Sequence, residues 1–226
     1  MEIYQLKIVL RGFSPMIWRR LLVDADTSLA ALHAIFQATM GWEDCHLHRF
    51  RIHGKDFGIT YQGGMSFADD PHRVQIGQFR LRPGERFLYE YDFADRWLHD
   101  VRLEATLPVE PRRFYPVCTA GKQACPPEDC GGVEDYLLQR RALFWAETED
   151  LQVLAEHAER LFDGRSLGLV EGSEEYAALA LAVAHTEARE RFALGSFDRH
   201  RVNLRLQRLQ TCTEGKYAVR DPSGVH

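Results

Sequence analysis

The sequence predicts an α+β fold: a mixed β-sheet with one helix packed across it, followed by a mainly helical C-terminal region. Three observations lead to this prediction. The first half of the chain shows strand-like and helix-like patterns in the order hairpin, helix, hairpin, as in β-grasp folds. The second half is rich in Ala, Leu, Glu and Arg at helical spacing. Hydrophobic residues make up 45% of the 226 positions, which is ordinary for a globular protein with a substantial core.

The opening hairpin and its helix are defined by apolar periodicity. Residues 3–10 and 17–23 are rich in apolar and β-branched side chains, which is typical of strands, and a turn at Ser14-Pro15 separates them. Asp26-Thr27-Ser28 supplies helix-capping residues, and Gly41 marks the end of the helix. The apolar residues between them fall at helical spacing: Leu29, Leu32, Ile35, Phe36 and Met40.

Further strands are predicted at residues 47–52, 86–93 and 97–107, with short elements near 57–59 and 74–76. A turn at Ala94-Asp95-Arg96 joins the last two strands into a second hairpin.

The composition changes at Pro108. Residues 108–132 contain five Pro, three Gly and three Cys, so we expect an ordered loop or a linker there. Helices are predicted beyond it, at residues 133–147, 148–162, 173–191 and 199–210. We divide the chain into an α+β core (2–136), a helical C-terminal region that packs on this core (137–212) and a flexible tail (213–226).

Charge and cysteine content limit the function classes. A net charge of −5 disfavours general nucleic-acid binding, although one side of the last helix carries a basic stripe of Arg201, Arg205 and Arg208. The sequence shows neither a membrane-length apolar run nor a signal peptide, so we expect a cytoplasmic protein without a membrane partner. The odd number of cysteines, five, disfavours a disulfide framework.

Two histidines form the first candidate site. In Cys45-His46-Leu47-His48, residues two apart on a strand face the same side, so His46 and His48 would project together as metal ligands. The alternative is that one ring packs against Trp42 or Tyr61 while the other caps a turn.

The second hairpin carries another candidate group: Asp92, Asp95, Trp97 and His99. A carboxylate beside an imidazole fixes its tautomer and raises its pKa, which suits general acid–base catalysis or support of a metal ligand. The alternative is structural, with the aspartates bonding the backbone of their own turn and Trp97 in the core.

Three cysteines form the third candidate site. Cys125 and Cys130 have four residues between them, a spacing that zinc sites use, whereas Cys118 and Cys125 have six. The fourth ligand could be Cys45, His46, His48 or His99, and we assign His48. In the alternative interpretation the cysteines are small buried hydrophobic residues.

These groups, in this order, resemble the plasmid pRiA4b ORF-3-like family, whose members also occur as TnpR-like passenger proteins of insertion elements. The resemblance covers residues 2 to about 136 and resumes at Gly195-Ser196-Phe197-Asp198 and Val202-Asn203. Two departures stand out: Ala94 replaces a usual Gly, and Arg199 replaces a usual Pro. The motifs that carry the resemblance are Ile17-Trp18-Arg19-Arg20, Gly41-Trp42, His46 to Phe50, Tyr91 to His99, and Cys118 to Gly132.

The resemblance implies an α+β fold, and it suggests a protein partner or mobile-element machinery. It does not establish an activity. Resolvase chemistry is not carried over, because the chain shows neither the nucleophilic Ser nor the Arg cluster that it needs.

Three hypotheses for the function follow, and the sequence does not decide whether the protein is an enzyme. The first is an accessory or binding protein with a structural zinc on Cys118, Cys125, Cys130 and His48. The second is a metal-dependent hydrolase-like enzyme that uses the candidates His46, His48, Asp92, Asp95 and His99. The third is a DNA-associated protein that uses the basic stripe.

Overall fold

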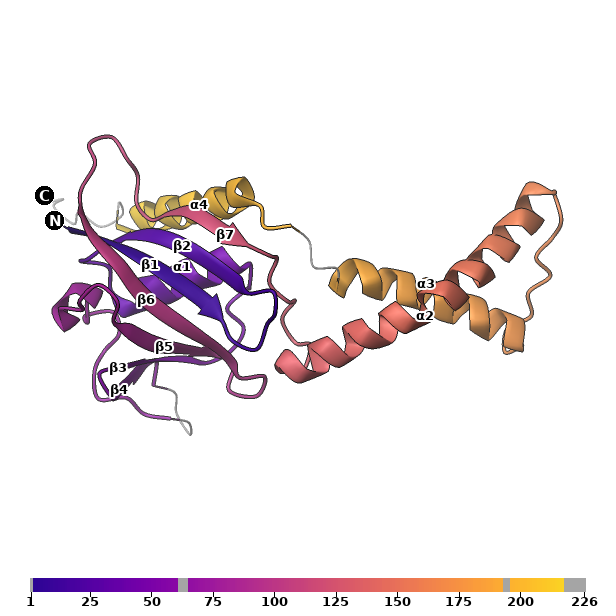
Figure 1. Cartoon of the computed structure of the whole chain (residues 1–226), viewed down its shortest axis with the longest axis horizontal. Coiled ribbons are helices and arrows are strands. Elements are labelled where there is room, and N and C mark those ends of the chain that lie inside the picture. The colour runs from indigo at the N-terminus through magenta and orange to yellow at the C-terminus, as the bar shows by residue number, and fades with distance from the viewer. Residues whose placement is uncertain (1, 61–64, 193–195, 218–226) are drawn as a thin grey trace, which may run out of the picture. The chain divides into compact units, whose positions relative to one another are not determined.

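The structure is a computed structural model that describes residues 2–60, 65–192 and 196–217, with residues 191, 192 and 210–217 described by their backbone alone. Its main feature is a seven-stranded sheet in the order β4-β3-β5-β6-β1-β2-β7 (Figure 1). The strands are β1 (Glu2–Leu10), β2 (Ile17–Asp24), β3 (His48–Ile52), β4 (Lys55–Gly58), β5 (Arg86–Tyr91), β6 (Trp97–Pro108) and β7 (Val117–Lys122).

Helix α1 (Leu29–Met40) packs across one face of the sheet, as the sequence predicts (Figure 1). Ser28 caps its start, since its hydroxyl accepts a hydrogen bond from the amide of Ala31 at 3.1 Å. Gly41 ends it at φ +94°, a left-handed conformation that glycine adopts without steric cost. The α+β class is therefore confirmed.

Two details of the predicted sheet are wrong. The sheet is not mixed, because each strand pairing in the described residues is antiparallel: β6 returns from its hairpin turn to lie beside β1 in the opposite direction. The segment 108–132 is also more than a loop. It contains β7, an edge strand that pairs with β2 despite its glycine at position 121.

The strand register places the residues that matter for the site in two rows on the face that α1 covers. Tyr89 pairs with Phe50 on one side and with His99 on the other. Two residues along the strand, Tyr91 lies between His48 and Trp97. Because side chains two apart share a face, both rows point toward α1.

The turn between β5 and β6 explains how Ala94 can replace a glycine. Positive φ angles occur at Asp92 (+55°) and Arg96 (+54°), and Ala94 is not among the residues with positive φ. A Cβ at position 94 therefore carries no backbone penalty.

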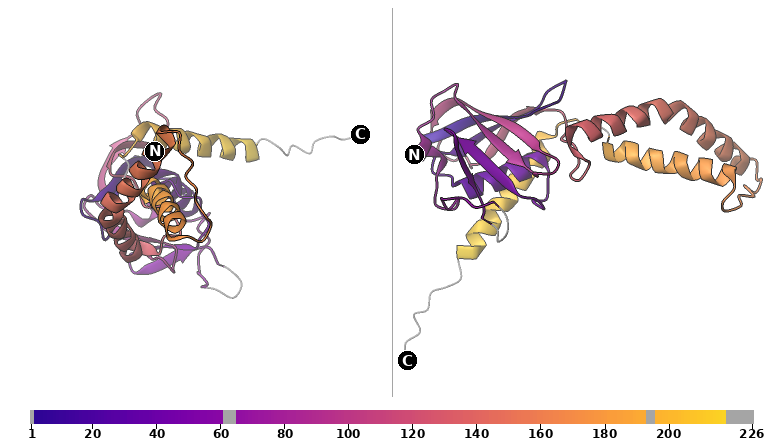
Figure 2. Two further views of the ribbon diagram at one scale, coloured as in Figure 1. Left: turned by 90° about the vertical axis from the view of Figure 1, so that its right-hand side faces the viewer. Right: turned by 90° about the horizontal axis from the view of Figure 1, so that it is seen from below.

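Contacts cluster the chain into two compact units, residues 1–128 with 195–226 and residues 129–194. The second unit is a hairpin of α2 (Gly132–Phe162) and α3 (Glu174–Phe192), which run side by side (Figure 2). The sequence predicts two helices over 133–162, but the structure has one continuous helix there. Thr148-Glu149-Asp150, taken from the sequence as a helix start, lies inside α2.

Helix α4 (Arg199–Tyr217) belongs to the unit that contains the sheet, whereas the sequence division grouped it with the other C-terminal helices. It extends into the predicted flexible tail, of which residues 218–226 lie outside the described residues. Cys212 lies in the part of α4 that is described by backbone alone.

The side chain of Asn203 on α4 makes two hydrogen bonds to the backbone of the edge strand β7. It accepts a hydrogen bond from the amide of Cys118 at 2.8 Å and donates one to the carbonyl of the same residue at 3.0 Å. An edge strand has unpaired backbone groups, and here a helix satisfies them.

Asn203→Ala should therefore lower the free energy of unfolding by about 1–3 kcal/mol, because it leaves two backbone groups of a buried residue without partners. Urea unfolding measures this change. Gln207→Ala, on an exposed position of α4, is the matched control and should change stability by less than about 0.5 kcal/mol. Equal effects of the two substitutions would contradict a stabilising role of the Asn203 hydrogen bonds.

Candidate metal centre

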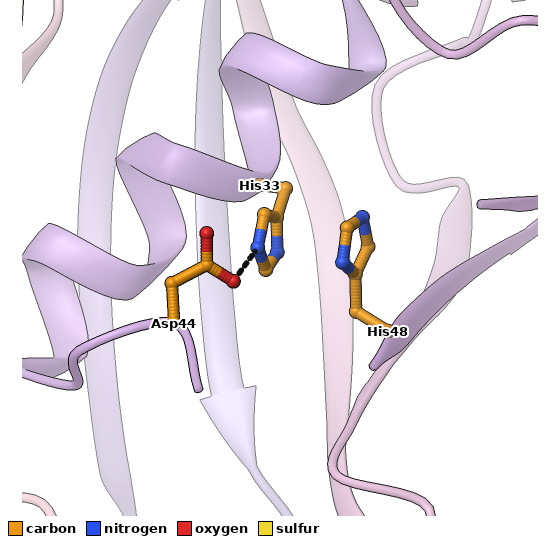
Figure 3. Close-up of side chains that lie close together, drawn as sticks. All are labelled: His33, Asp44 and His48. Carbon is orange, nitrogen blue, oxygen red and sulfur yellow. Dashed lines mark hydrogen bonds and ion pairs between the residues drawn. The ribbon is translucent and has the colours of Figure 1, made fainter. Parts of the chain in front are cut away.

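His33 on α1 is the centre of a polar group inside the core (Figure 3). Its Nε2 lies 2.6 Å from Oδ1 of Asp44, and its Nδ1 lies 2.8 Å from the hydroxyl of Tyr89. Gln37, one helical turn further along α1, donates its amide hydrogen to the same hydroxyl at 2.9 Å. His33 and Gln37 of the helix therefore both reach the hydroxyl of Tyr89 on β5.

The direction of these hydrogen bonds follows from the chemistry of Asp44. Partial burial alone would raise the pKa of its carboxyl group, but the hydrogen bond and charge of His33, with a smaller effect of His48, lower the pKa below its usual value. Asp44 is thus a carboxylate and can only accept. In the neutral form of His33, Nε2 carries the proton and Nδ1 accepts from the Tyr89 hydroxyl.

His48, the first residue of β3, stacks on His33 with ring centroids 3.4 Å apart and ring planes inclined by 6°. Burial lowers the pKa of His48 to about 3, helped by its neighbour His33 and opposed by Asp44, so its ring is neutral at pH 7. Its Nε2 is buried, and no described group gives it a hydrogen bond. A neutral imidazole nitrogen with a free lone pair is a metal ligand.

The loop between α1 and β3 is shaped to bring Asp44 to His33. Asp44 has φ +61°, a left-handed conformation that Asp tolerates better than most residues. The amide of Glu43 donates to Oε2 of Glu128 at 2.6 Å, and the amide of Cys45 donates to the hydroxyl of Tyr91 at 3.0 Å. Tyr91 in turn donates to Oε1 of Glu128 at 2.5 Å. These bonds hold both neighbours of Asp44 in place.

One ligand atom from each of His33, Asp44 and His48 lies within 4.8 Å of the other two. The carboxylate of Asp44 is half exposed and faces a hollow of about 320 Å³. The hollow is lined by Asp44, Cys45, His46, Leu47, His48 and Ile59, so four of its six lining residues are of types that bind metals.

The structure places the predicted pair His46 and His48 in different surroundings. His46 lies before β3, with its Nε2 3.7 Å from Oδ2 of Asp92, whereas His48 stacks on His33. Asp92 is buried, and its Oδ1 accepts from the amides of Ala94 and Asp95 at 2.9 and 3.3 Å. This is the turn-forming role that the structural alternative describes. Tyr61, a suggested packing partner, lies outside the described residues.

His99 lies in the core rather than in the hollow. It packs edge-on against Trp42 and beside Tyr89, at centroid distances of 5.5 and 5.2 Å. Burial lowers its pKa to about 3, and weaker backbone contacts with Tyr89 and Trp97 oppose the shift. Neither ring nitrogen has a hydrogen bond of ordinary geometry among the described residues.

Two of the predicted zinc ligands are thiols with raised pKa values. Burial raises the pKa of Cys118 to about 11 and also raises that of Cys125. Cys118 is a residue of β7, and the sulfur of Cys125 lies 3.1 Å from the sulfur of Met40. Cys130 is buried and belongs to the other compact unit. The ligand set Cys118, Cys125, Cys130 and His48 stays a prediction.

The basic stripe on α4 is only partly exposed. Arg201 and Arg208 are exposed, but the guanidinium of Arg205 lies against Gly41 at the C-terminal end of α1. A cation there complements the negative end of the helix dipole.

None of the helices in the described ranges is long and apolar enough to span a membrane.

A model of the family described as plasmid pRiA4b ORF-3-like protein matches residues 2–170. The chain belongs to this family. The match extends beyond residue 136 and includes all of α2, so this helix belongs to the family pattern. The uncharacterized protein y4hQ of Sinorhizobium fredii is 33% identical over 136 residues, which cover 60% of this chain and 70% of that protein.

The fold is also similar to a crystal structure of a protein of unknown function, MM3350, from Methanosarcina mazei Go1. The TM-score is 0.58 and the sequence identity 31%, over 88% of this chain and 96% of that one. These relatives support the family and the fold, and the chemistry has to be argued from the site itself.

Sequence reasoning missed His33 and Asp44. One signal was available for His33: it and Gln37 are four residues apart and interrupt an otherwise apolar helix face, which indicates that both meet a buried polar partner. Asp44 gave no comparable signal, because its role depends on the fold of its loop.

The neutral, buried state of His99 makes stability depend on pH. In the unfolded chain the imidazole of His99 binds a proton as the pH falls below about 6.5, whereas in the folded protein it stays neutral down to about pH 3. Folding stability is therefore lost progressively as the pH falls through that window. His99→Leu should lessen the pH dependence of the unfolding free energy by about 1.4 kcal/mol per pH unit there. Urea unfolding of chelator-treated protein at several pH values measures it.

The control is His53→Gln, because His53 is exposed in the turn after β3. This substitution should leave the slope of the unfolding free energy against pH unchanged. A slope in His99→Leu equal to that of the unsubstituted protein would show that His99 is not held neutral by burial.

Proposed function

We propose that the protein binds one divalent ion of the zinc class through His33, Asp44 and His48, and that this ion serves hydrolytic chemistry on a substrate that enters the hollow. The observation that carries the proposal is the convergence of these three side chains, of which Asp44 and His48 line the hollow. Zinc–nitrogen and zinc–oxygen bonds of about 2 Å put tetrahedral ligand atoms about 3.3 Å apart, so the three side chains, whose ligand atoms lie within 4.8 Å of one another, would have to move closer and the stacked ring of His48 would have to turn when an ion binds.

Three protein ligands beside a hollow are typical of a catalytic site, which keeps one position open, rather than of a closed structural site. When bound, such an ion lowers the pKa of a water molecule toward neutrality. The chain's own residues prepare the ligands. With Nε2 of His33 on the ion, its Nδ1 would carry a proton and donate a hydrogen bond to the hydroxyl of Tyr89, which would fix the orientation of the ring. The hydroxyl proton of Tyr89 would then turn to Oε1 of Gln37 after a flip of that amide, because this buried oxygen has no hydrogen bond among the described residues.

The lowered pKa values of Asp44 and His48 support the same proposal. Asp44 and His48 are therefore already in their metal-binding protonation states at neutral pH. The predicted cysteine ligands differ, since their raised pKa values would require thiol protons to be released. His46 and Cys45 line the same hollow and would contact a substrate.

Titration of metal-free protein with Zn²⁺ in a calorimeter tests the site. One ion should bind per chain, and His48→Gln and Asp44→Asn should each weaken binding by at least about tenfold, because each removes a ligand or its charge. Asp26→Asn is the control for Asp44→Asn, because Asp26 is an exposed carboxylate in a turn outside the site. Cys118→Ser and Cys125→Ser should leave the affinity unchanged.

Loss of the bound ion in the cysteine variants, with full binding retained in Asp44→Asn, would favour the accessory protein with a structural zinc and reject the proposed site. Tyr89→Phe adds a finer test. It removes the group that orients His33 and should weaken zinc binding by roughly 10–100-fold while leaving the stoichiometry unchanged.

A further inference from the structure

The hairpin of α2 and α3 has its large apolar side chains on the outside. Polar contacts dominate the surface where the two helices meet: Asp150 binds Arg189 and lies 3.0 Å from His185, and Arg160 binds Glu175. The side chains of Phe144 and Trp145 are instead 68% and 70% exposed, and three leucines of α2 join them: Leu137, Leu138 and Leu151.

These five residues lie on one side of α2, called here the outer face. At about 100° per residue, Leu137, Phe144 and Leu151 lie almost in line along the helix, and Leu138 and Trp145 form a second line. The exposed residues Arg141 and Thr148 lie between the two lines, so the outer face is mixed, with large apolar side chains on either side of a polar line. Asp150 and His157, which are buried toward α3, lie on the opposite side of the helix. Large apolar side chains grouped on an exposed surface mark an interaction site.

The charges at the edges of the outer face identify its partner. Arg140 and Glu147 lie seven residues apart along one edge, and Leu138 and Trp145 lie along the other. When two helices pack antiparallel, each edge faces the same edge of its partner. Two copies of α2 would then pair Arg140 with Glu147 of the second copy twice, and Leu138 with Trp145 twice. Parallel packing would instead place charged edges against apolar ones.

We propose that the outer face of α2 is a homodimer interface, in which two copies of the chain pack their α2 helices antiparallel around Phe144 and Trp145. The contact is self-complementary, as a two-fold interface requires. With α3 behind each α2, the two hairpins form a four-helix arrangement that buries the five apolar side chains of each outer face.

Sedimentation equilibrium of the full chain over the micromolar range tests the proposal. The expected mass is twice the 26.1 kDa of one chain. Trp145→Glu should raise the dissociation constant at least about thirtyfold, because it replaces the largest apolar side chain of the interface with a charge. Glu187→Arg, an exposed acidic position on α3, is the control and should leave it unchanged. A monomer at all concentrations would reject the proposal, whether another protein or the chain's own sheet covers the face.

Charge reversal separates the antiparallel dimer from any other association. Arg140→Glu or Glu147→Arg alone changes two attractive pairs into two repulsive ones and should weaken the homodimer about tenfold. Mixing these two variants should restore association to within about threefold of the unsubstituted protein, because each then meets its opposite charge on the other chain. Dimers that are insensitive to the single reversals, or a mixture no tighter than the variants alone, would overturn the antiparallel arrangement.

Discussion

The hydroxyl group of Tyr89 is the constraint on which the site depends. Tyr89 is completely buried in the middle of the sheet, and both hydrogen-bond partners of its hydroxyl, His33 and Gln37, come from α1. A buried hydroxyl without partners costs about 1–3 kcal/mol, so the helix has to dock with these two side chains over Tyr89. That docking turns the far nitrogen of His33 toward the loop that carries Asp44. When α1 packs on the sheet, the polar group is therefore assembled at the same time.

The same tyrosine connects the core to the chemistry proposed for the hollow. Its position beside Phe50 and His99 is set by the strand register, which also puts Tyr91 next to His48 and under Trp42. Tyr91 and Glu128 hold the loop around Asp44, so a carboxylate on an irregular segment is positioned by residues of the sheet and of the segment after β7. Ligands supported in this way are preorganised, which is what metal affinity requires.

Much of the fold can be predicted from the sequence, because alternation and helical periodicity are local signals. The opening hairpin, α1 with its Ser28 cap and Gly41 end, and the strands β3, β5 and β6 all follow from them. The failures have physical causes. Strand β7 is held by pairing with β2 and by Asn203, contacts distant in sequence, while its own segment is rich in Pro and Gly. Residues 148–150 have the composition of a helix start, but the helix that precedes them simply continues.

The candidate site was harder to predict than the fold. His48 could be chosen from its position beside His46, but its actual neighbours are His33 on a helix and Asp44 in a loop at positive φ. No spacing rule links residues 33, 44 and 48, since their approach depends on how α1 packs on the sheet. The clustering of three cysteines within residues 118–130 drew attention to chemistry that burial of Cys118 and Cys125 disfavours.

Anomalous diffraction at the zinc absorption edge, from crystals of the full chain grown with Zn²⁺, tests the central claim most directly. The account predicts an anomalous peak about 2.0–2.2 Å from Nε2 of His33, from a ring nitrogen of His48 and from a carboxylate oxygen of Asp44, with the fourth position open to the hollow. A peak at the sulfur atoms of Cys118 and Cys125, with none at His33, would contradict it.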